Sequence, residues 1–306
     1  MRLIFMGTPD FAVPSLLLLL AHRYEIAAVV TAPDNPRGRG QKVTPSPVKT
    51  VALAHQLPIL QPASLTSPDF LAALQRYQAH LQIVVAFRML PQAVWALPPH
   101  GTFNLHASLL PAYRGAAPIN WAIINGEQET GVTTFFIDES MDTGQVIFQD
   151  KTPIHPHDTA GTLHERLKHQ GAQLVLQTVR AIERGTCPRT PQAPTPVSLH
   201  KKAPKLHKKD CLVIWLQPAT AVVNFIRGLS PYPAAWAVWE DKTYKILQAT
   251  VAQDCSVQLQ PGETCTNGQQ RLLVGTQTVP VAIQILQPAG KKPMDVRAFL
   301  CGNQLG

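Results

Sequence analysis

The 306-residue sequence predicts an α/β protein in which a mostly parallel sheet is followed by a small β-barrel. Over residues 1–187, short apolar runs alternate with helical segments, which is the pattern of βαβ units. Beyond residue 234, five short strand-like runs separated by turns are typical of a small barrel. Between the two lies a segment rich in proline and lysine. We therefore expect a first domain at 1–187, a linker at 188–209 and a barrel at 210–306.

The chain begins with a predicted strand–helix–strand unit. Residues 2–6 form the first strand, and Thr8 and Pro9 are typical of a helix start, with Thr8 as the N-cap. The helix should run over 9–20 and lead into a strand at 25–31. The turn after the first strand lacks the G-x-G-x-x-G pattern, so we do not expect NAD or FAD to bind there.

The remaining elements follow from the same periodicities. Further helices are expected at 48–55, 69–77, 118–124, 159–184 and 224–229. Further strands are expected at 59–60, 81–87, 102–106, 132–137 and 146–148, and barrel strands at 235–240, 244–249, 255–259, 271–274 and 279–286. In an open α/β sheet, ligands bind beyond the carboxyl ends of the strands. The segments that follow the strands at 81–87 and 102–106 should therefore border one site.

The basic charge lies mainly in the last two-fifths of the chain. Residues 1–187 have 14 Lys/Arg and 13 Asp/Glu, which gives +1, whereas residues 188–306 have 13 and 6, which gives +7 of the net +8. Lys201, Lys202 and Lys205 lie in the linker. A basic half favours a polyanionic partner, with nucleic acid first, although a solubilising surface charge would give the same count.

A long polar loop is expected at 32–47, with Arg37, Arg39 and Lys42 among glycines and prolines. Loops of this length without secondary structure are usually functional or disordered. Guanidinium groups on a flexible backbone suit the capture of phosphate. The alternative is a solvated loop that binds nothing.

The cysteines and the apolar runs bear on location. The five cysteines are scattered, with no C-x-x-C pair, so neither a disulfide framework nor a zinc site is predicted and a reducing cytoplasm is expected. The apolar run at 16–20 is too short to span a bilayer, and no membrane association is expected.

Asn104 and His106 are the most informative pair in the sequence. Residues i and i+2 of a strand point to the same face, so both side chains should project into one site. An amide donor for a developing oxyanion beside a proton acceptor suits acyl transfer. Asp142, in a loop that contains Gly144, is the expected third member, orienting the imidazole. Taken singly, the histidine could be a core residue and Asp142 a turn-former.

These residues resemble the 10-formyltetrahydrofolate-dependent formyltransferases. The resemblance rests first on residues 104–118 and on Met141 to Gly144. Within that family, five further segments resemble the members that act on methionyl initiator tRNA: Phe5 to Phe11, Gly38 to Gly40, Pro45 to Lys49, Ser230 to Pro233 and Leu286 to Lys292.

The resemblance implies a Rossmann-like catalytic domain and an OB-like, tRNA-binding barrel. The expected reaction transfers the formyl group of 10-formyltetrahydrofolate to the α-amine of methionine on initiator tRNA, for translation initiation. Asn104 and His106 would stabilise the oxyanion, His106 would also move a proton, and Asp142 would hold His106 and an ordered water. No metal is implied, and a monomer is expected.

The resemblance also implies which residues contact the two substrates. The expected folate contacts lie after the two central strands, at Ser108, Leu109, Leu110, Pro111, Phe87, Met89 and Leu90. The expected tRNA contacts are basic and lie in the 32–47 loop and the linker, at Arg37, Arg39, Lys42, Lys201, Lys202 and Lys205.

Three departures from the family pattern are visible. The rim at 86–91 is one residue shorter than usual and lacks a glycine, Ile214 stands where an aspartate is common, and Gln145 stands where an acid is common. Two other functions remain open: a sugar-nucleotide formyltransferase, and a non-catalytic RNA-binding protein on the same fold. Tyr113 and Arg114 either pack within their loop or contact substrate.

Overall fold

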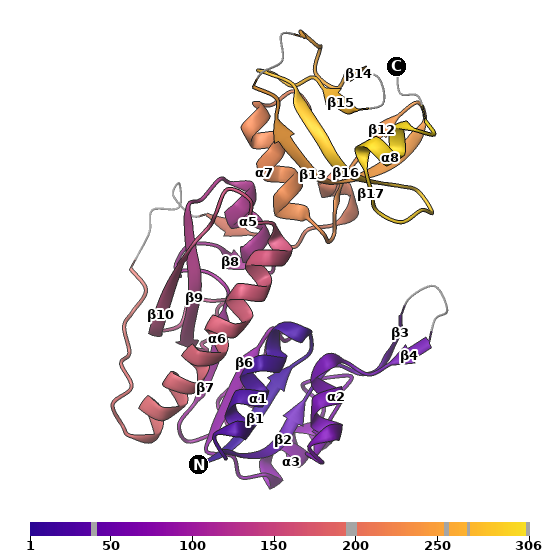
Figure 1. Cartoon of the computed structure of the whole chain (residues 1–306). Helices are drawn as coiled ribbons and strands as arrows, with labels where there is room; N and C mark the ends of the chain where they lie inside the picture. The colour runs from indigo at the N-terminus through magenta and orange to yellow at the C-terminus, as the bar shows by residue number, and fades with distance from the viewer. Residues whose placement is uncertain (38–41, 194–200, 254–256, 268–269, 304–306) are drawn as a thin grey trace. The chain divides into compact units, whose positions relative to one another are not determined.

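The computed structural model describes residues 1–37, 42–193, 201–253, 257–267 and 270–303 (Figure 1). The chain divides into two compact units. The first comprises Met1–Gly115, Gly131–Thr152 and His164–Lys201, and the second comprises Ala116–Thr130, Pro153–Leu163 and Lys202–Gly306. No helix within the described ranges is long and apolar enough to cross a bilayer.

The first unit is built on a seven-stranded sheet with the order β10-β9-β7-β6-β1-β2-β5. Its strands are β1 (Arg2–Gly7), β2 (Glu25–Val30), β5 (Ile59–Leu60), β6 (Leu81–Val85), β7 (Thr102–His106), β9 (Glu129–Phe136) and β10 (Val146–Pro153). The β1–β2, β1–β6, β2–β5 and β6–β7 pairs are parallel, whereas β7 and β9 are antiparallel. The prediction of a mostly parallel sheet is confirmed.

Helices and shorter elements complete the N-terminal two-thirds of the chain. They are a 3-10 turn (Asp10–Ala12), α1 (Val13–Ala21), β3 (Asn35–Arg37), β4 (Lys42–Thr44), α2 (Pro47–Ala54), α3 (Pro68–Arg76), α4 (Gln92–Trp95), β8 (Arg114–Gly115), α5 (Pro118–Ile124) and α6 (Ala160–Glu183). Ser46 and Ser67 cap α2 and α3 by accepting main-chain N–H groups in the first turn, and a proline follows each cap.

The two faces of the sheet are covered by different helices. Ile4, Met6 and Val84 pack with α3 and α4 on one face. On the other face, Leu105 meets α6 so closely that a Cβ on Gly171 would lie 2.7 Å from a Leu105 methyl group. Since side chains alternate along a strand, Asn104 and His106 project away from α6.

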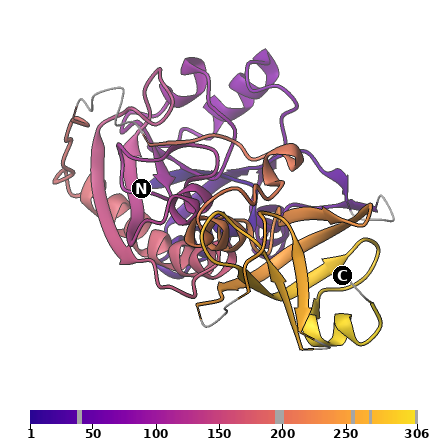
Figure 2. The ribbon, with the colours of Figure 1, turned by 90° about the horizontal axis from the view of Figure 1, so that it is seen from above.

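The second unit holds an antiparallel, curled sheet. Its strands are β12 (Ala235–Trp239), β13 (Lys242–Val251), β14 (Thr264–Asn267), β15 (Arg271–Val274), β16 (Val281–Pro288) and β17 (Met294–Asp295), in the order β12-β13-β16-β15-β14, with β17 beside β16. The orange and yellow strands in Figure 2 follow one another around this curve. The unit also contains β11 (Lys202–Ala203), a 3-10 turn (Lys208–Cys211), α7 (Ala219–Leu229) and α8 (Val296–Leu300).

Helix α7 covers the open side of the curled sheet. Val222, Ile226 and Leu229 recur at helical spacing and are buried in the core of this unit. Helix α5 also belongs to the unit, and the Asn120 side chain donates from its Nδ2 to the Gly228 carbonyl oxygen at 2.8 Å. The predicted barrel is therefore confirmed as a curled half-barrel with a helix across it.

Several predicted element boundaries were wrong. Thr8 does not cap the first helix, because its hydroxyl accepts the Ala32 main-chain N–H at 3.3 Å, and the helix proper begins only at Val13. The strand predicted at 81–87 ends at Val85, and Ala86 has a φ of 48°, which breaks the extended chain.

Other differences concern hairpins and the barrel. The loop predicted at 32–47 contains the β3–β4 hairpin. Helix α7 starts five residues earlier than the predicted helix at 224–229. Of the strand predicted at 255–259, Cys255 and Ser256 lie outside the described residues. Residues 257–259 form no strand. The strand in this region is β14 instead, which pairs with β15 in antiparallel register.

Candidate active site

Asn104 and His106 lie at the carboxyl end of β7, as predicted. In register they face Phe135 and Thr133 of β9, and Asn104 also pairs with Val84 of β6. Asn104 is half-buried, and within the described part of the chain its side-chain amide makes no hydrogen bond. An amide held by a strand with its polar atoms uncommitted is available to a ligand.

The His106 ring is held by the main chain. It is 7% exposed, and its Nε2 lies 2.8 Å from the Tyr113 carbonyl oxygen. Because a carbonyl oxygen only accepts, Nε2 must carry the proton. The other ring nitrogen, Nδ1, lies 3.9 Å from Asp142 Oδ2. In the neutral ring, Nδ1 is therefore the atom that can take up a proton.

The Asp142 loop reaches this site by folding back. β9 is antiparallel to β7, so its end at Phe136 lies beside Phe103, at the start of β7. The β9–β10 loop nevertheless brings the Asp142 carboxylate to His106, where Oδ2 also accepts the Gly115 N–H at 2.9 Å. Asp142 has a φ of 57°, in the left-handed region.

Close packing fixes the far side of this loop. A Cβ on Gly144 would lie 1.7 Å from the Phe136 carbonyl oxygen, so only glycine fits there. Asp138 Oδ1 accepts the Ser140 N–H and the Thr143 hydroxyl, at 3.1 and 2.7 Å. The structure thus places this glycine-containing loop beside the His106 imidazole.

The turn at 108–113 is braced by buried hydroxyl groups. Ser108 Oγ donates to the Ala112 carbonyl oxygen at 2.6 Å, and Thr133 Oγ1 donates to the Ser108 carbonyl oxygen at 2.6 Å. Tyr113 has a φ of 60° and its N–H donates to the Lys201 carbonyl oxygen. This turn is what aims the Tyr113 carbonyl group at His106.

The residues expected to contact folate differ in exposure. Ser108 and Leu110 are buried, and Leu109 and Pro111 are half-buried. Beyond β6, Met89 is 72% exposed. Phe87 is half-buried and Leu90 is buried in the core beneath α3 and α4.

The residues expected to contact tRNA lie in two places. Arg37 and Lys42 pair with each other at the last rung of the β3–β4 hairpin, and Arg39 lies outside the described residues. The Lys201, Lys202 and Lys205 side chains are exposed.

The foot of that hairpin is tied down by a polar network. The Lys49 ammonium group binds the Asp34 carboxylate and, at 2.7 Å, Gln61 Oε1, while Gln61 Nε2 donates to Asp34 Oδ1 at 2.9 Å. The hydrogen bond from Lys49, followed by that from Gln61, holds the pKa of the Asp34 carboxyl group below its usual value. Lys49 thus braces the segment that leads to Arg37.

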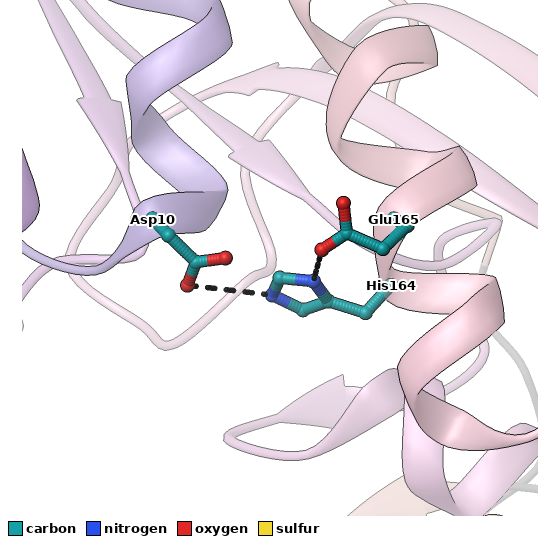
Figure 3. A group of neighbouring side chains, drawn as sticks. All are labelled: Asp10, His164 and Glu165. Carbon is teal, nitrogen blue, oxygen red and sulfur yellow. Dashed lines mark ion pairs between the residues drawn. The ribbon is translucent and has the colours of Figure 1, made fainter.

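One group of converging metal-type ligands occurs in the described residues, and it lies outside this site. Asp10, His164 and Glu165 approach one another, with His164 Nε2 3.9 Å from Asp10 and Nδ1 3.5 Å from Glu165 (Figure 3). Lys168 Nζ lies 2.6 Å from Glu165 Oε2 and 3.7 Å from Asp10 Oδ2. The cluster already has a cation, so it is explained as a surface ion-pair network.

Sequence reasoning left the role of Tyr113 open and missed two residues that support the site. Thr133 binds the turn, and Gln192 binds the loop from the linker, 50 residues beyond Asp142. Arg189 of the same segment contacts β9 instead, with its guanidinium carbon 4.1 Å from the Phe136 ring centroid. No local signal in the sequence marks Gln192, because its partners lie 48 to 78 residues away in the chain.

Comparisons with known proteins agree with this geometry. The formyl transferase family model matches residues 1–179, more than half of the chain, and the model of the formyl transferase C-terminal domain matches residues 205–304. A methionyl-tRNA formyltransferase of Bacteroides fragilis is 47% identical over 311 residues, which cover 100% of this chain and 96% of that protein.

Solved structures share the fold at lower identity. HypX from Aquifex aeolicus, in complex with tetrahydrofolic acid, is 20% identical with a TM-score of 0.66, over 98% of this chain and 47% of that one. An N-formyltransferase from Helicobacter canadensis, in complex with folinic acid and dTDP-3-aminofucose, is 21% identical with a TM-score of 0.67, over 92% and 98% of the two chains.

The full-length relative favours the enzyme that acts on methionyl-tRNA over the two alternatives. The sugar-nucleotide enzyme shares only the fold with this chain. Against a non-catalytic RNA-binding protein, both formyl transferase models match the chain, and the chain has the expected Asn104, His106 and Asp142. The chain therefore belongs to the formyl transferase family, within its methionyl-tRNA formyltransferase branch.

Proposed function

We propose that Asn104, His106 and Asp142 carry out the transfer of a formyl group from 10-formyltetrahydrofolate to the α-amine of methionine on initiator tRNA. The observation that carries the proposal is the uncommitted Asn104 amide beside a histidine whose Nδ1 faces a carboxylate. In this role, the Asn104 amide donates a hydrogen bond to the oxyanion that develops on the formyl oxygen.

His106 Nδ1 is the proposed proton acceptor. As the bond from the methionine nitrogen to the formyl carbon forms, the amine loses a proton to Nδ1. His106 returns that proton as the bond from the formyl carbon to the folate N10 breaks, so the leaving nitrogen ends protonated. The negative Asp142 carboxylate favours the charged imidazolium in between. Their 3.9 Å separation exceeds a direct hydrogen bond and suits one bridging water.

The folate contacts are proposed from exposed apolar groups that fit a flat pterin. Met89 is 72% exposed and Met141, beside Asp142, is 58% exposed, so neither flexible thioether is committed to the core and both can pack against a ligand. Within Ser108, Leu109, Leu110 and Pro111, the half-buried Leu109 and Pro111 are the side chains that can reach a ligand. Phe87 and Leu90 would support the rim from below. When bound, the folate supplies the formyl group, and no metal is needed in this scheme.

The tRNA contacts are proposed from charge. Arg37, Arg39 and Lys42 would bind the acceptor stem, and Lys201, Lys202 and Lys205 would bind phosphates elsewhere. In this scheme the catalytic domain is 1–187, the linker is 188–209 and the tRNA-binding barrel is 210–306. We further propose that the chain acts as a monomer in the cytoplasm, where initiator tRNA is found.

The proposal is tested by the choice of acceptor. The purified chain is supplied with 10-formyltetrahydrofolate and one of three acceptors: methionyl initiator tRNA, methionyl elongator tRNA or a dTDP-amino sugar. Rapid formylation of the initiator tRNA alone is expected. Formylation of the sugar nucleotide at an equal or higher kcat/KM would contradict the proposal in favour of the sugar-nucleotide alternative, and formylation of none would favour the RNA-binding one.

A further inference from the structure

The Gln192 side chain bridges Arg114 and the Asp142 loop. Its Oε1 accepts hydrogen bonds from Arg114 Nε at 3.2 Å and from Arg114 Nη2 at 2.5 Å. Its Nε2 donates to the main-chain oxygens of Asp142 and Gly144, at 2.9 and 2.8 Å. One side chain therefore makes four hydrogen bonds, two on each side of its amide.

Chemistry permits one orientation of this amide. Arg114 offers only donors, and the two carbonyl oxygens offer only acceptors. A flipped amide would set N–H against N–H on one side and oxygen against oxygen on the other. Arg114 thus orients Gln192, and Gln192 in turn holds the loop.

The two carbonyl groups that Gln192 binds lie on either side of Thr143. Asp142 has a φ of 57°, and Gly144 is pressed against the Phe136 carbonyl oxygen, so this turn is both unusual and tightly packed. Two hydrogen bonds from one rigid amide fix the Asp142–Thr143 and Gly144–Gln145 peptide planes. The first of these planes adjoins the Asp142 Cα, so it helps to set the direction in which the Asp142 side chain leaves the backbone.

We propose that Gln192, oriented by Arg114, is a positioning residue for Asp142, and that it sets the distance from the carboxylate to His106. The inference rests on the proposed role of Asp142 in the reaction. Gln192 lies outside both segments that the family models match, 1–179 and 205–304. The linker, through Gln192, thus helps to position a residue of the active site.

Gln192→Glu isolates the effect. A glutamate side chain has nearly the same shape and still accepts from Arg114, but it presents oxygen to the two carbonyl groups and loses both loop bonds. We expect kcat to fall about 10- to 30-fold with little change in either KM, because a carboxylate displaced by about 1 Å costs rate rather than binding. Gln192→Ala should behave alike.

A non-catalytic readout accompanies the rates. In hydrogen–deuterium exchange of the free enzyme, the amides of residues 139–145 should exchange at least about tenfold faster in Gln192→Glu than in wild type, since local opening sets exchange rates. Arg189→Gln is the matched control, because it alters the same segment and its contact with Phe136 but leaves the Gln192 bonds in place. It should keep both the wild-type kcat and the slow exchange of the loop.

A double-mutant cycle with Asp142→Asn separates the inference from the proposal on which it rests. If Gln192 acts through Asp142, adding Gln192→Glu to Asp142→Asn should lower kcat by less than about twofold. Fully additive effects, or a Gln192→Glu enzyme with wild-type kcat and loop exchange, would overturn the inference while leaving Asp142 catalytic. A wild-type kcat in Asp142→Asn itself would instead contradict the proposed role of Asp142.

Discussion

The Tyr113 carbonyl oxygen accepts the Nε2–H of His106 at 2.8 Å, and this one bond decides which histidine nitrogen is free for chemistry. Tyr113 is buried and adopts a φ of 60°, so the bond is built into the turn. It leaves Nδ1 as the only site for a transferred proton and aims it at Asp142.

His106→Gln should separate the structural and the catalytic roles of the imidazole. A glutamine amide can still donate to the Tyr113 carbonyl oxygen, but it cannot take up a proton at neutral pH. We expect a melting temperature within a few degrees of wild type and a single-turnover rate lowered about 100-fold. A variant with the wild-type rate would show that His106 acts only as a hydrogen-bond donor.

Gly144→Ala should displace the Asp142 loop. The added Cβ would lie 1.7 Å from the Phe136 carbonyl oxygen, a main-chain atom that cannot move without disturbing β9. We expect kcat to fall about 100-fold, because the carboxylate moves away from His106. Gly302→Ala is the control, since nothing lies within 4 Å of its added Cβ. Equal rates for wild type and Gly144→Ala would contradict the placement of the loop.

The linker lysines should contribute to the salt dependence of tRNA binding. Replacing Lys201, Lys202 and Lys205 by glutamine removes three exposed charges. The slope of log Kd against log salt should fall by roughly 0.7–0.9 for each phosphate that the variant no longer neutralises. Exchanging Lys151, an exposed lysine of β10 outside the barrel, for glutamine is the comparison. An unchanged slope in the triple variant would exclude these lysines from binding tRNA phosphates.

Acid should loosen the foot of the β3–β4 hairpin. The pKa of Asp34 is held below its usual value by Lys49 and Gln61, so the carboxylate stabilises the fold above its unfolded pKa. That contribution is lost as the pH falls through the lowered folded pKa. We expect proteolytic cleavage within 33–45 to accelerate at low pH in wild type, and already at neutral pH in Asp34→Asn. Equal cleavage of both proteins at neutral pH would mean that the network does not hold the hairpin.

Local patterns predicted the parts of the site that lie on one strand. The two-residue period of a strand was enough to place Asn104 and His106 together, and the apolar runs were enough to predict a mostly parallel sheet.

What the sequence did not reveal are contacts between distant segments. Thr8 has the chemistry of an N-cap, but Ala32, just after the end of β2, offered its hydroxyl another partner. Gln192 is 78 residues from Arg114, and nothing local distinguishes it from any solvated glutamine. Because β9 is antiparallel to β7, the Asp142 loop must also fold back to reach His106. The alternation of apolar residues along a strand does not predict the direction in which that strand runs.

The central claim is that Asn104 and His106 form one centre for formyl transfer. The most direct test is the single-turnover rate of Asn104→Ala and His106→Ala with methionyl initiator tRNA and saturating 10-formyltetrahydrofolate. Each variant should lose about 100-fold or more in this rate, and the double variant should lose much less than the product, because the two groups act on the same step. Rates near wild type in both single variants would contradict the account.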